Sequence, residues 1–122
     1  MKVAVSAEGS GLDSAVDARF GRAANFIVVD TETMEFDCIV NGAVNAAGGA
    51  GISAAKTVAD SGAKAVLTGN CGPNAERALT AAGIKIYANV SGTVRDAVEA
   101  FKNGKLSETD GPTVDSHFGT GA

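Results

Sequence analysis

Residues 62–73 read Gly-Ala-Lys-Ala-Val-Leu-Thr-Gly-Asn-Cys-Gly-Pro. The run over residues 64–68 is short and apolar, which is typical of a strand buried on both faces of a sheet. A glycine turn follows, and then a proline, a residue favoured in the first turn of a helix. A buried strand, a glycine loop and a helix in immediate succession indicate an α/β domain.

The same pattern continues outward in both directions. Toward the amino terminus, the link between residues 30 and 34 is short enough to predict an antiparallel hairpin. The expected order is therefore β-ββ-αβαβα, a five-stranded mixed sheet with helices packed on it. Glycines follow two of the expected helices, and Ser91 or Thr93 caps the last one. Strands are predicted over residues 2–6, 26–30, 34–41, 64–68 and 84–87, and helices over residues 51–61, 73–82 and 93–104.

The strand predicted over residues 34–41 has an alternating pattern. Met34, Phe36, Cys38 and Val40 share one face, because side chains alternate along a strand. This alternation predicts that Cys38 is a small residue of the core, in keeping with the usual burial of cysteine.

Length and composition limit the classes of function. The chain has 122 residues, which suits one domain, predicted over residues 1–106 and followed by a flexible polar tail over residues 107–122. A net charge of −4 argues against a nucleic-acid partner. No apolar run approaches the roughly 20 residues of a membrane helix. Two cysteines and a strand pattern directly at the amino terminus predict a cytoplasmic protein.

Catalytic constellations are poorly represented. The single histidine, His117, lies in the predicted tail, and the expected central strands carry no carboxylates. We therefore expect a protein that is not an enzyme. Two alternatives stay open. Cys71 precedes a helix start, where the helix dipole lowers a thiol pKa, so a thiol-dependent redox enzyme is one alternative to a buried, inert cysteine. A nucleotide- or oxyanion-binding regulatory module is the other, because residues 49–54 weakly resemble a dinucleotide fingerprint.

Anion binding is the chemistry that the loops favour. In open sheets, ligands bind beyond the carboxyl ends of the parallel strands, where we expect the loops over residues 7–25, 42–51 and 69–73 to converge. Helix amino termini offer unpaired N–H groups there, and Arg19 and Arg22 add positive charge. The candidate metal ligands are Cys71 and His117. The predicted binding residues are Gly9, Gly11, Arg19, Phe20, Gly21, Arg22, Gly48, Gly49, Gly51, Gly69, Asn70, Cys71 and Gly72.

Several of these segments also carry a family resemblance. Residues 1–6, the stretch Asp17-Ala18-Arg19-Phe20-Gly21-Arg22-Ala23, and residues 62–69, 75–87 and 91–106 resemble the dinitrogenase iron–molybdenum cofactor biosynthesis family. The Phe-Gly-Arg-Ala loop is the most specific part of this resemblance, which covers about residues 1–107.

The resemblance implies a ribonuclease-H-like five-stranded fold and a noncatalytic carrier of a metal–sulfur cluster, with a delivery protein as a further partner. Family members often have histidine where this chain has Arg19, and many have another histidine within the segment equivalent to residues 45–49. The departures shift the expected binding from imidazole coordination toward charge and hydrogen bonding. They also make the chain more similar to a histidine-poor member associated with a molybdenum–copper–sulfide cluster than to iron–molybdenum–sulfur carriers.

Overall fold

The computed structural model describes residues 1–42 and 49–109. Within them the chain forms five strands and three helices in the order βββαβαβα, as predicted. The strands are β1 (Lys2–Ala7), β2 (Asn25–Asp30), β3 (Phe36–Val40), β4 (Ala65–Leu67) and β5 (Lys85–Tyr87). The helices are α1 (Ala50–Asp60), α2 (Pro73–Ala81) and α3 (Val94–Lys102).

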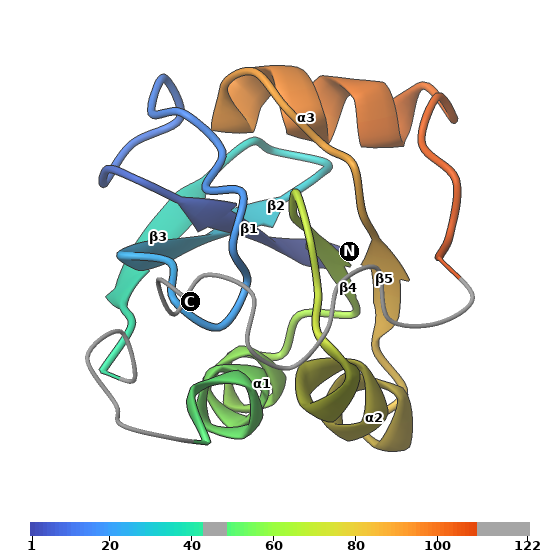
Figure 1. Ribbon diagram of the computed structural model, residues 1–122. Coiled ribbons are helices and arrows are strands. Elements are labelled where there is room, and N and C mark those ends of the chain that lie inside the picture. The colour runs from blue at the N-terminus through green and yellow to red at the C-terminus, as the bar shows by residue number, and fades with distance from the viewer. Residues whose placement is uncertain (43–48, 110–122) are drawn as a thin grey trace.

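The five strands form one mixed sheet in the order β3-β2-β1-β4-β5. β1 pairs antiparallel with β2, and β2 with β3, whereas β4 lies parallel to both β1 and β5. Figure 1 shows α3 on one face of this sheet and α1 with α2 on the other. The expected five-stranded mixed sheet with packed helices is thus confirmed. Because β1, β4 and β5 are parallel, the segments that follow them emerge at one edge of the sheet.

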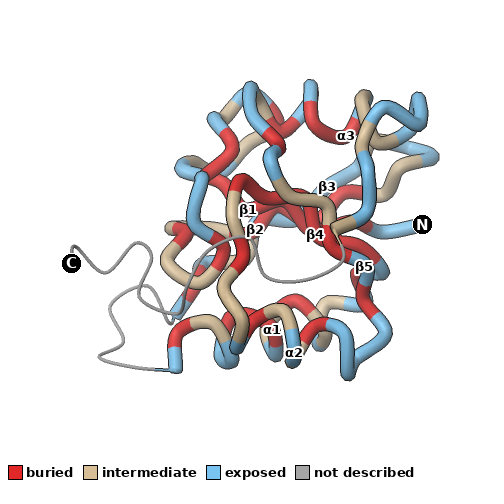
Figure 2. Tube along the Cα trace, turned by 45° about the vertical axis from the view of Figure 1, so that its right-hand side comes forward, coloured by how far each residue is buried: buried red, intermediate tan, exposed pale blue. Residues whose placement is uncertain are grey.

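The central strands are buried on both faces, as Figure 2 shows. Their side chains alternate between two apolar clusters. One cluster packs Ala4, Phe26 and Val66 against α1 and α2, and the other packs Val3, Val5 and Leu67 against α3. Burial on both faces explains why the strands read as continuous apolar runs.

Helix ends follow the local chemistry of the sequence. Thr93 forms a capping box with Asp96 at the start of α3, accepting from the Asp96 amide at 3.1 Å. Thr93, rather than Ser91, is therefore the cap. Gly62 and Gly83 follow α1 and α2 with φ values of 86° and 76°, a backbone conformation that favours glycine.

The prediction for Cys38 is wrong. Cys38 does lie on the face shared with Phe36 and Val40, but all three side chains are exposed, because β3 is an outer strand of the sheet. Met34 lies outside the strand and is half-buried. The alternation identified which residues share a face, but it gave no information about which strand lies at the edge.

The end of the described chain lies along the free edge of β5. The Thr109 amide donates to the Ile86 carbonyl at 2.7 Å, and the Thr109 hydroxyl accepts from the Ala88 amide at 3.1 Å. The division into a domain over residues 1–106 and a tail over residues 107–122 stays a prediction. Among the described residues, no helix is both long and apolar enough to span a membrane.

Candidate functional site

Two loops meet at the carboxyl ends of β1 and β4. Arg19 forms an isolated parallel bridge with Asn70, and the Phe20 amide donates to the Asn70 carbonyl at 3.1 Å. These contacts join the loop after β1 to the loop before α2. The predicted convergence therefore holds for these two loops.

Gly69 permits this close approach. A Cβ atom at Gly69 would lie only 2.6 Å from the Cα of Ala18 and 2.9 Å from the Ala18 carbonyl oxygen. Both are backbone atoms that cannot move without separating the loops. The requirement for glycine at this position is thus one of space, and it joins the two loops as a rigid pair.

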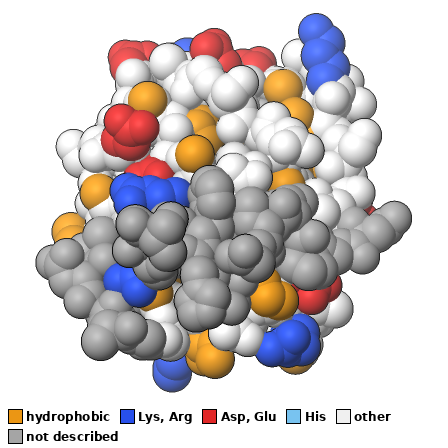
Figure 3. All heavy atoms as spheres, viewed as in Figure 1, with side chains coloured by type: hydrophobic (Ala, Val, Ile, Leu, Met, Phe, Trp, Pro, Cys, Tyr) orange, Lys and Arg blue, Asp and Glu red, His pale blue; other side chains and the backbone are white. Residues whose placement is uncertain are grey.

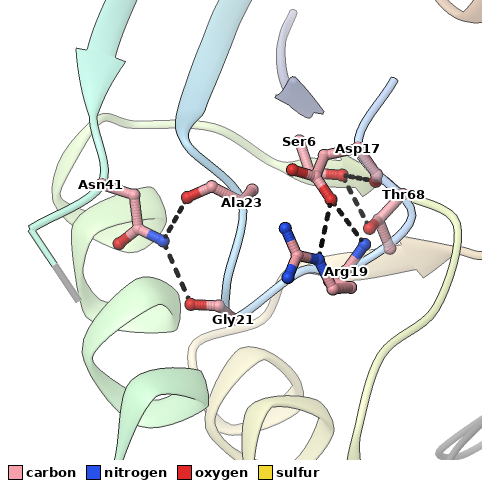
Figure 4. A network of polar contacts seen from close by, with 7 residues as sticks. All are labelled: Ser6, Asp17, Arg19, Gly21, Ala23, Asn41 and Thr68. Atoms are coloured by element: carbon pink, nitrogen blue, oxygen red, sulfur yellow. Dashed lines mark hydrogen bonds and ion pairs between the residues drawn. The ribbon is translucent and has the colours of Figure 1, made fainter. Parts of the chain in front are cut away.

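A buried polar network holds the loop against the ends of β1 and β4, as Figure 4 shows. The Ser6 hydroxyl donates to the Asp17 carbonyl and hydrogen-bonds with the Thr68 hydroxyl, each at 2.7 Å. The Asp17 amide in turn donates to the Ser6 carbonyl at 2.8 Å. Because all three residues are buried, these bonds are shielded from competing water and hold the loop in place.

Asp17 and Arg19 form the charged part of the site. The Asp17 carboxylate oxygen Oδ1 accepts from the Arg19 amide at 3.0 Å and lies 3.4 Å from the Arg19 Nε. The Arg19 side chain is 44% exposed, whereas that of Asp17 is only 6% exposed. A fixed, buried carboxylate thus holds one side of a guanidinium whose other nitrogens are available at the surface.

The loop continues into a clasp formed by Asn41, which follows β3. Its side-chain amide donates to the Gly21 carbonyl at 3.1 Å and to the Ala23 carbonyl at 2.9 Å. Asn41 is 1% exposed, and its bond to the Ala23 carbonyl is buried, whereas the bond to the Gly21 carbonyl is partly buried. Arg22 lies between these two residues in the sequence. It is half-buried and already engaged in an interaction.

Gly21 places the loop directly against the start of α1. A Cβ at Gly21 would lie 3.1 Å from both the nitrogen and the Cα of Gly51, and one at Gly51 would lie 3.1 Å from the Cβ of Ala75 in α2. Small residues therefore bring the Arg19 loop, the first turn of α1 and the first turn of α2 together.

The amino termini of α1 and α2 differ from that of α3. Neither Gly49, the αL residue before α1, nor Gly72 before α2 provides a side-chain cap. The first turn of α1 also contains no acidic residue. Such a turn presents backbone N–H groups with partial positive charge, which favours an anion nearby.

Cys71 is buried beneath these loops. It is 1% exposed, and its sulfur contacts the Gly72 carbonyl at 3.7 Å. Burial, with a smaller contribution from the charge of Glu76, raises the pKa of the Cys71 thiol to about 12. The expectation of a lowered pKa is therefore wrong, because desolvation outweighs the effect of the helix start.

The other predicted site residues are distributed more widely. Gly9 and Gly11 lie in the segment that packs toward α3, where the Arg95 amide donates to the Leu12 carbonyl. The Phe20 ring lies in the core, 5.1 Å from the Phe26 ring. Gly48 and His117 fall outside the described residues.

Charge on this side of the molecule is local rather than continuous. Lys and Arg side chains are scattered over the face in Figure 3, with acidic and apolar side chains between them. Among the described residues, no three His, Cys, Asp or Glu side chains lie close enough to hold a metal ion together. The arrangement suits a small anion that contacts Arg19 and backbone amides.

Sequence reasoning missed the residues that support the loop. Asp17, Ser6, Thr68 and Asn41 are the buried polar residues of the described chain. Asp17 lies two positions before Arg19, a spacing typical of an Asx turn, in which the aspartate side chain accepts from the amide two residues later. The sequence therefore contained a signal for this one contact. The partners of Ser6 and Asn41 are distant in sequence and emerge only in the fold.

A comparison with models of protein families shows which family this chain belongs to. The model of the family described as dinitrogenase iron–molybdenum cofactor matches residues 1–104, which include every strand, every helix and the Arg19 loop. The chain belongs to this family. The resemblance inferred from the Phe-Gly-Arg-Ala loop is thereby confirmed.

Solved structures of similar proteins have the same fold. The apo form of the orange protein from Desulfovibrio gigas is 50% identical, with a TM-score of 0.90 over 93% of this chain and 96% of that one. A NifB-type protein from Thermotoga is 36% identical, with a TM-score of 0.77 over 88% and 91%. An uncharacterized protein of Methanocaldococcus jannaschii is 29% identical over 88% of this chain and 91% of its own length.

Proposed function

We propose that this protein binds and carries an anionic metal–sulfur cluster without catalysing a reaction on it. The family supports a metal–sulfur cluster as the cargo. The observation that carries the proposal for this chain is that the exposed Arg19 guanidinium belongs to the loop whose Gly21 packs against Gly51, in the uncapped first turn of α1. The guanidinium and this turn both contribute positive charge at one sheet edge, and neither requires a metal–protein bond.

A sulfide-rich cluster such as molybdenum–copper–sulfide suits this junction better than an iron–molybdenum–sulfur cluster held by imidazole. The histidines typical of the family are replaced here, by Arg19 in one case. Sulfide ligands spread negative charge over large, polarizable atoms, which small side chains and glycine backbone can approach closely. Gly21 and Gly51, which are half-buried and packed against each other, are small residues of this kind close to the Arg19 loop.

The alternative of a thiol-dependent enzyme is disfavoured by Cys71. A nucleophilic or ligating thiol must be reachable and ionised, whereas this one is buried with its pKa raised to about 12. The two cysteines are not joined in a disulfide, which fits the proposed cytoplasmic location, where thiols stay reduced. A delivery protein remains part of the proposal, since a carrier must receive and release its cargo.

The proposal is tested by anaerobic reconstitution with tetrathiomolybdate and copper(I), followed by gel filtration. We expect molybdenum and copper to elute with the protein and to give visible absorption. Arg19→Ala should reduce the retained metal severalfold, whereas Cys38→Ser, on the distant β3, should leave it unchanged. Absence of retained metal, or equal retention by Arg19→Ala, would contradict the proposal.

A second measurement separates cluster binding from a nucleotide- or oxyanion-binding module. Thermal unfolding is followed with ATP, NAD, phosphate, molybdate or tetrathiomolybdate added separately. We expect the thioanion to raise the unfolding temperature the most. Stabilisation by a nucleotide alone would favour the regulatory module instead. Metal and sulfide analysis of protein purified anaerobically from its native cells then identifies the cluster.

A further inference from the structure

The Asp17–Arg19 pair places a negative charge inside a site that we propose binds an anion. This carboxylate cannot turn away, because the backbone of Asp17 is bonded to Ser6 in both directions and its side chain is 6% exposed. It faces the Nε of Arg19 at 3.4 Å. Any anion that approaches the guanidinium therefore meets a fixed charge of its own sign.

The neighbouring groups leave this charge without another cation. Among the described residues, the only ion pair of Asp17 is the one with Arg19. The Ser6 hydroxyl, which also hydrogen-bonds with the Thr68 hydroxyl, donates to the backbone carbonyl of Asp17 rather than to its carboxylate. The carboxylate and the cargo thus share one guanidinium. A structural role alone needs only an acceptor for the Arg19 amide, which an uncharged side chain provides equally well.

We propose that Asp17 is an internal counterion that competes with the cargo for Arg19 and keeps the cargo exchangeable. This inference rests on the proposed function and concerns the regulation of the same site. A carrier that must give up its cluster gains from a carboxylate that takes over the arginine as the cluster leaves. Asp17 is then a residue that tunes affinity, and its removal tightens binding.

The sign of the effect distinguishes this role from a structural one. Asp17→Asn keeps the oxygen that accepts from the Arg19 amide and removes the charge. The Arg19 side chain is 44% exposed, so solvent screens its charge and the gain should be of the size of an exposed ion pair, roughly two- to fivefold in affinity. A residue that only shaped the loop would leave binding unchanged, or weaken it, when replaced.

The chain offers a matched control in Asp13. Its Oδ1 lies 3.2 Å from the Nε of Arg95, so Asp13→Asn removes the same charge from the same kind of pair. This pair lies on the earlier part of the same loop, which packs toward α3. A general change in net charge would affect both variants, whereas a local counterion affects only Asp17→Asn.

The test is equilibrium dialysis against tetrathiomolybdate for the wild type, Asp17→Asn, Asp13→Asn, Arg19→Ala and Asp17→Asn/Arg19→Ala. We expect tighter binding and slower release only for Asp17→Asn, and no gain from this change when Arg19 is absent. Circular dichroism checks that each variant folds. If Asp17→Asn does not fold, Asp17→Ser replaces it, because a serine hydroxyl can also accept from the Arg19 amide.

The outcomes separate the two claims. Binding by the wild type with equal or weaker binding by the Asp17 variants would overturn the counterion role and leave the proposed function standing. An equal gain for Asp13→Asn would also overturn it. Failure of every protein to bind the thioanion would refute the proposed function and this inference with it.

Discussion

At the scale of single residues, burial decides the chemistry of the two thiols. Cys38 lies exposed on an edge strand, whereas Cys71 is 1% exposed beneath the site. The strand pattern predicted that Cys38 lies in the core, whereas for Cys71 an activated thiol at a helix start and a buried, inert cysteine were both open. Neither outcome could be read from local pattern, because both depend on which segments cover the residue.

The exposure difference predicts thiol reactivity. With a disulfide-exchange reagent at pH 8, one thiol per chain should react quickly and the second only when the protein is unfolded. Cys38→Ser should abolish the fast reaction, because its side chain is the accessible one. A fast reaction that persists in Cys38→Ser would show that Cys71 is reachable and would revive the redox alternative.

The raised pKa of Cys71 predicts a loss of stability in alkali. Its ordinary value of 9.0 rises to about 12 in the folded protein, so the unfolded chain loses this proton first. The stabilising contribution is complete below about pH 9 and is lost as the pH rises toward 12, with a slope of up to about 1.4 kcal/mol per pH unit. The free energy of unfolding, measured by urea denaturation, should fall less steeply in Cys71→Ala. Identical slopes would contradict this assignment.

Gly69 and Gly11 provide a matched pair of glycine substitutions. Gly69→Ala places a Cβ 2.6 Å from the Ala18 backbone and should cost about 1–3 kcal/mol through overpacking. Gly11→Ala meets no atom within 4 Å and should be nearly neutral. Urea denaturation measures both, and an equal effect of the two changes would mean that the loops are not held in close contact.

At the scale of secondary-structure elements, the order of strands and helices was predictable because each strand and helix carries its own periodicity. The order in which the strands lie side by side in the sheet was harder to predict. The edge position of β3 leaves Phe36 and Val40 exposed, although their pattern matches that of a covered strand. Likewise, glycines and arginines predicted which loops bind the proposed anion, but nothing in the sequence predicted the clasp from Asn41.

The clasp gives a test at this scale. Asn41→Asp replaces an amide that donates to two carbonyls with oxygens that repel them, and its burial excludes water as a substitute. We expect destabilisation of about 1–3 kcal/mol. Asn25→Asp, whose half-buried amide bonds only to the Gly9 carbonyl, should cost less. The reverse ranking in thermal unfolding would contradict the clasp.

At the scale of the whole molecule, the fold brings together the first turn of α1, the first turn of α2 and the loop that carries the exposed Arg19. The Arg19 loop lies between the buried Ser6–Thr68 network and the first turn of α1, and small residues set its spacing. Family membership supports a metal–sulfur cluster as the proposed cargo, and this arrangement suggests where it sits. The remaining site prediction concerns Gly48 and His117, which lie outside the described residues.

Truncation tests how much the contact between Thr109 and the edge of β5 contributes to stability. A chain ending at residue 106 lacks the two hydrogen bonds that Thr109 makes with β5, whereas one ending at residue 109 keeps them. We expect the shorter chain to be less stable by about 1–2 kcal/mol in urea denaturation. Equal stability of the two would mean that this edge contact contributes nothing.

The location of the cargo is the central claim, and NMR chemical-shift mapping tests it most directly. Tetrathiomolybdate with copper(I) is titrated into ¹⁵N-labelled protein, and the backbone amide and arginine Nε resonances are followed. We predict that the largest shifts fall on the Arg19 side chain, on residues 50–52 and on residues 69–72, with α3 and β3 nearly unchanged. Shifts concentrated on α3 or β3, with Arg19 unaffected, would contradict the account.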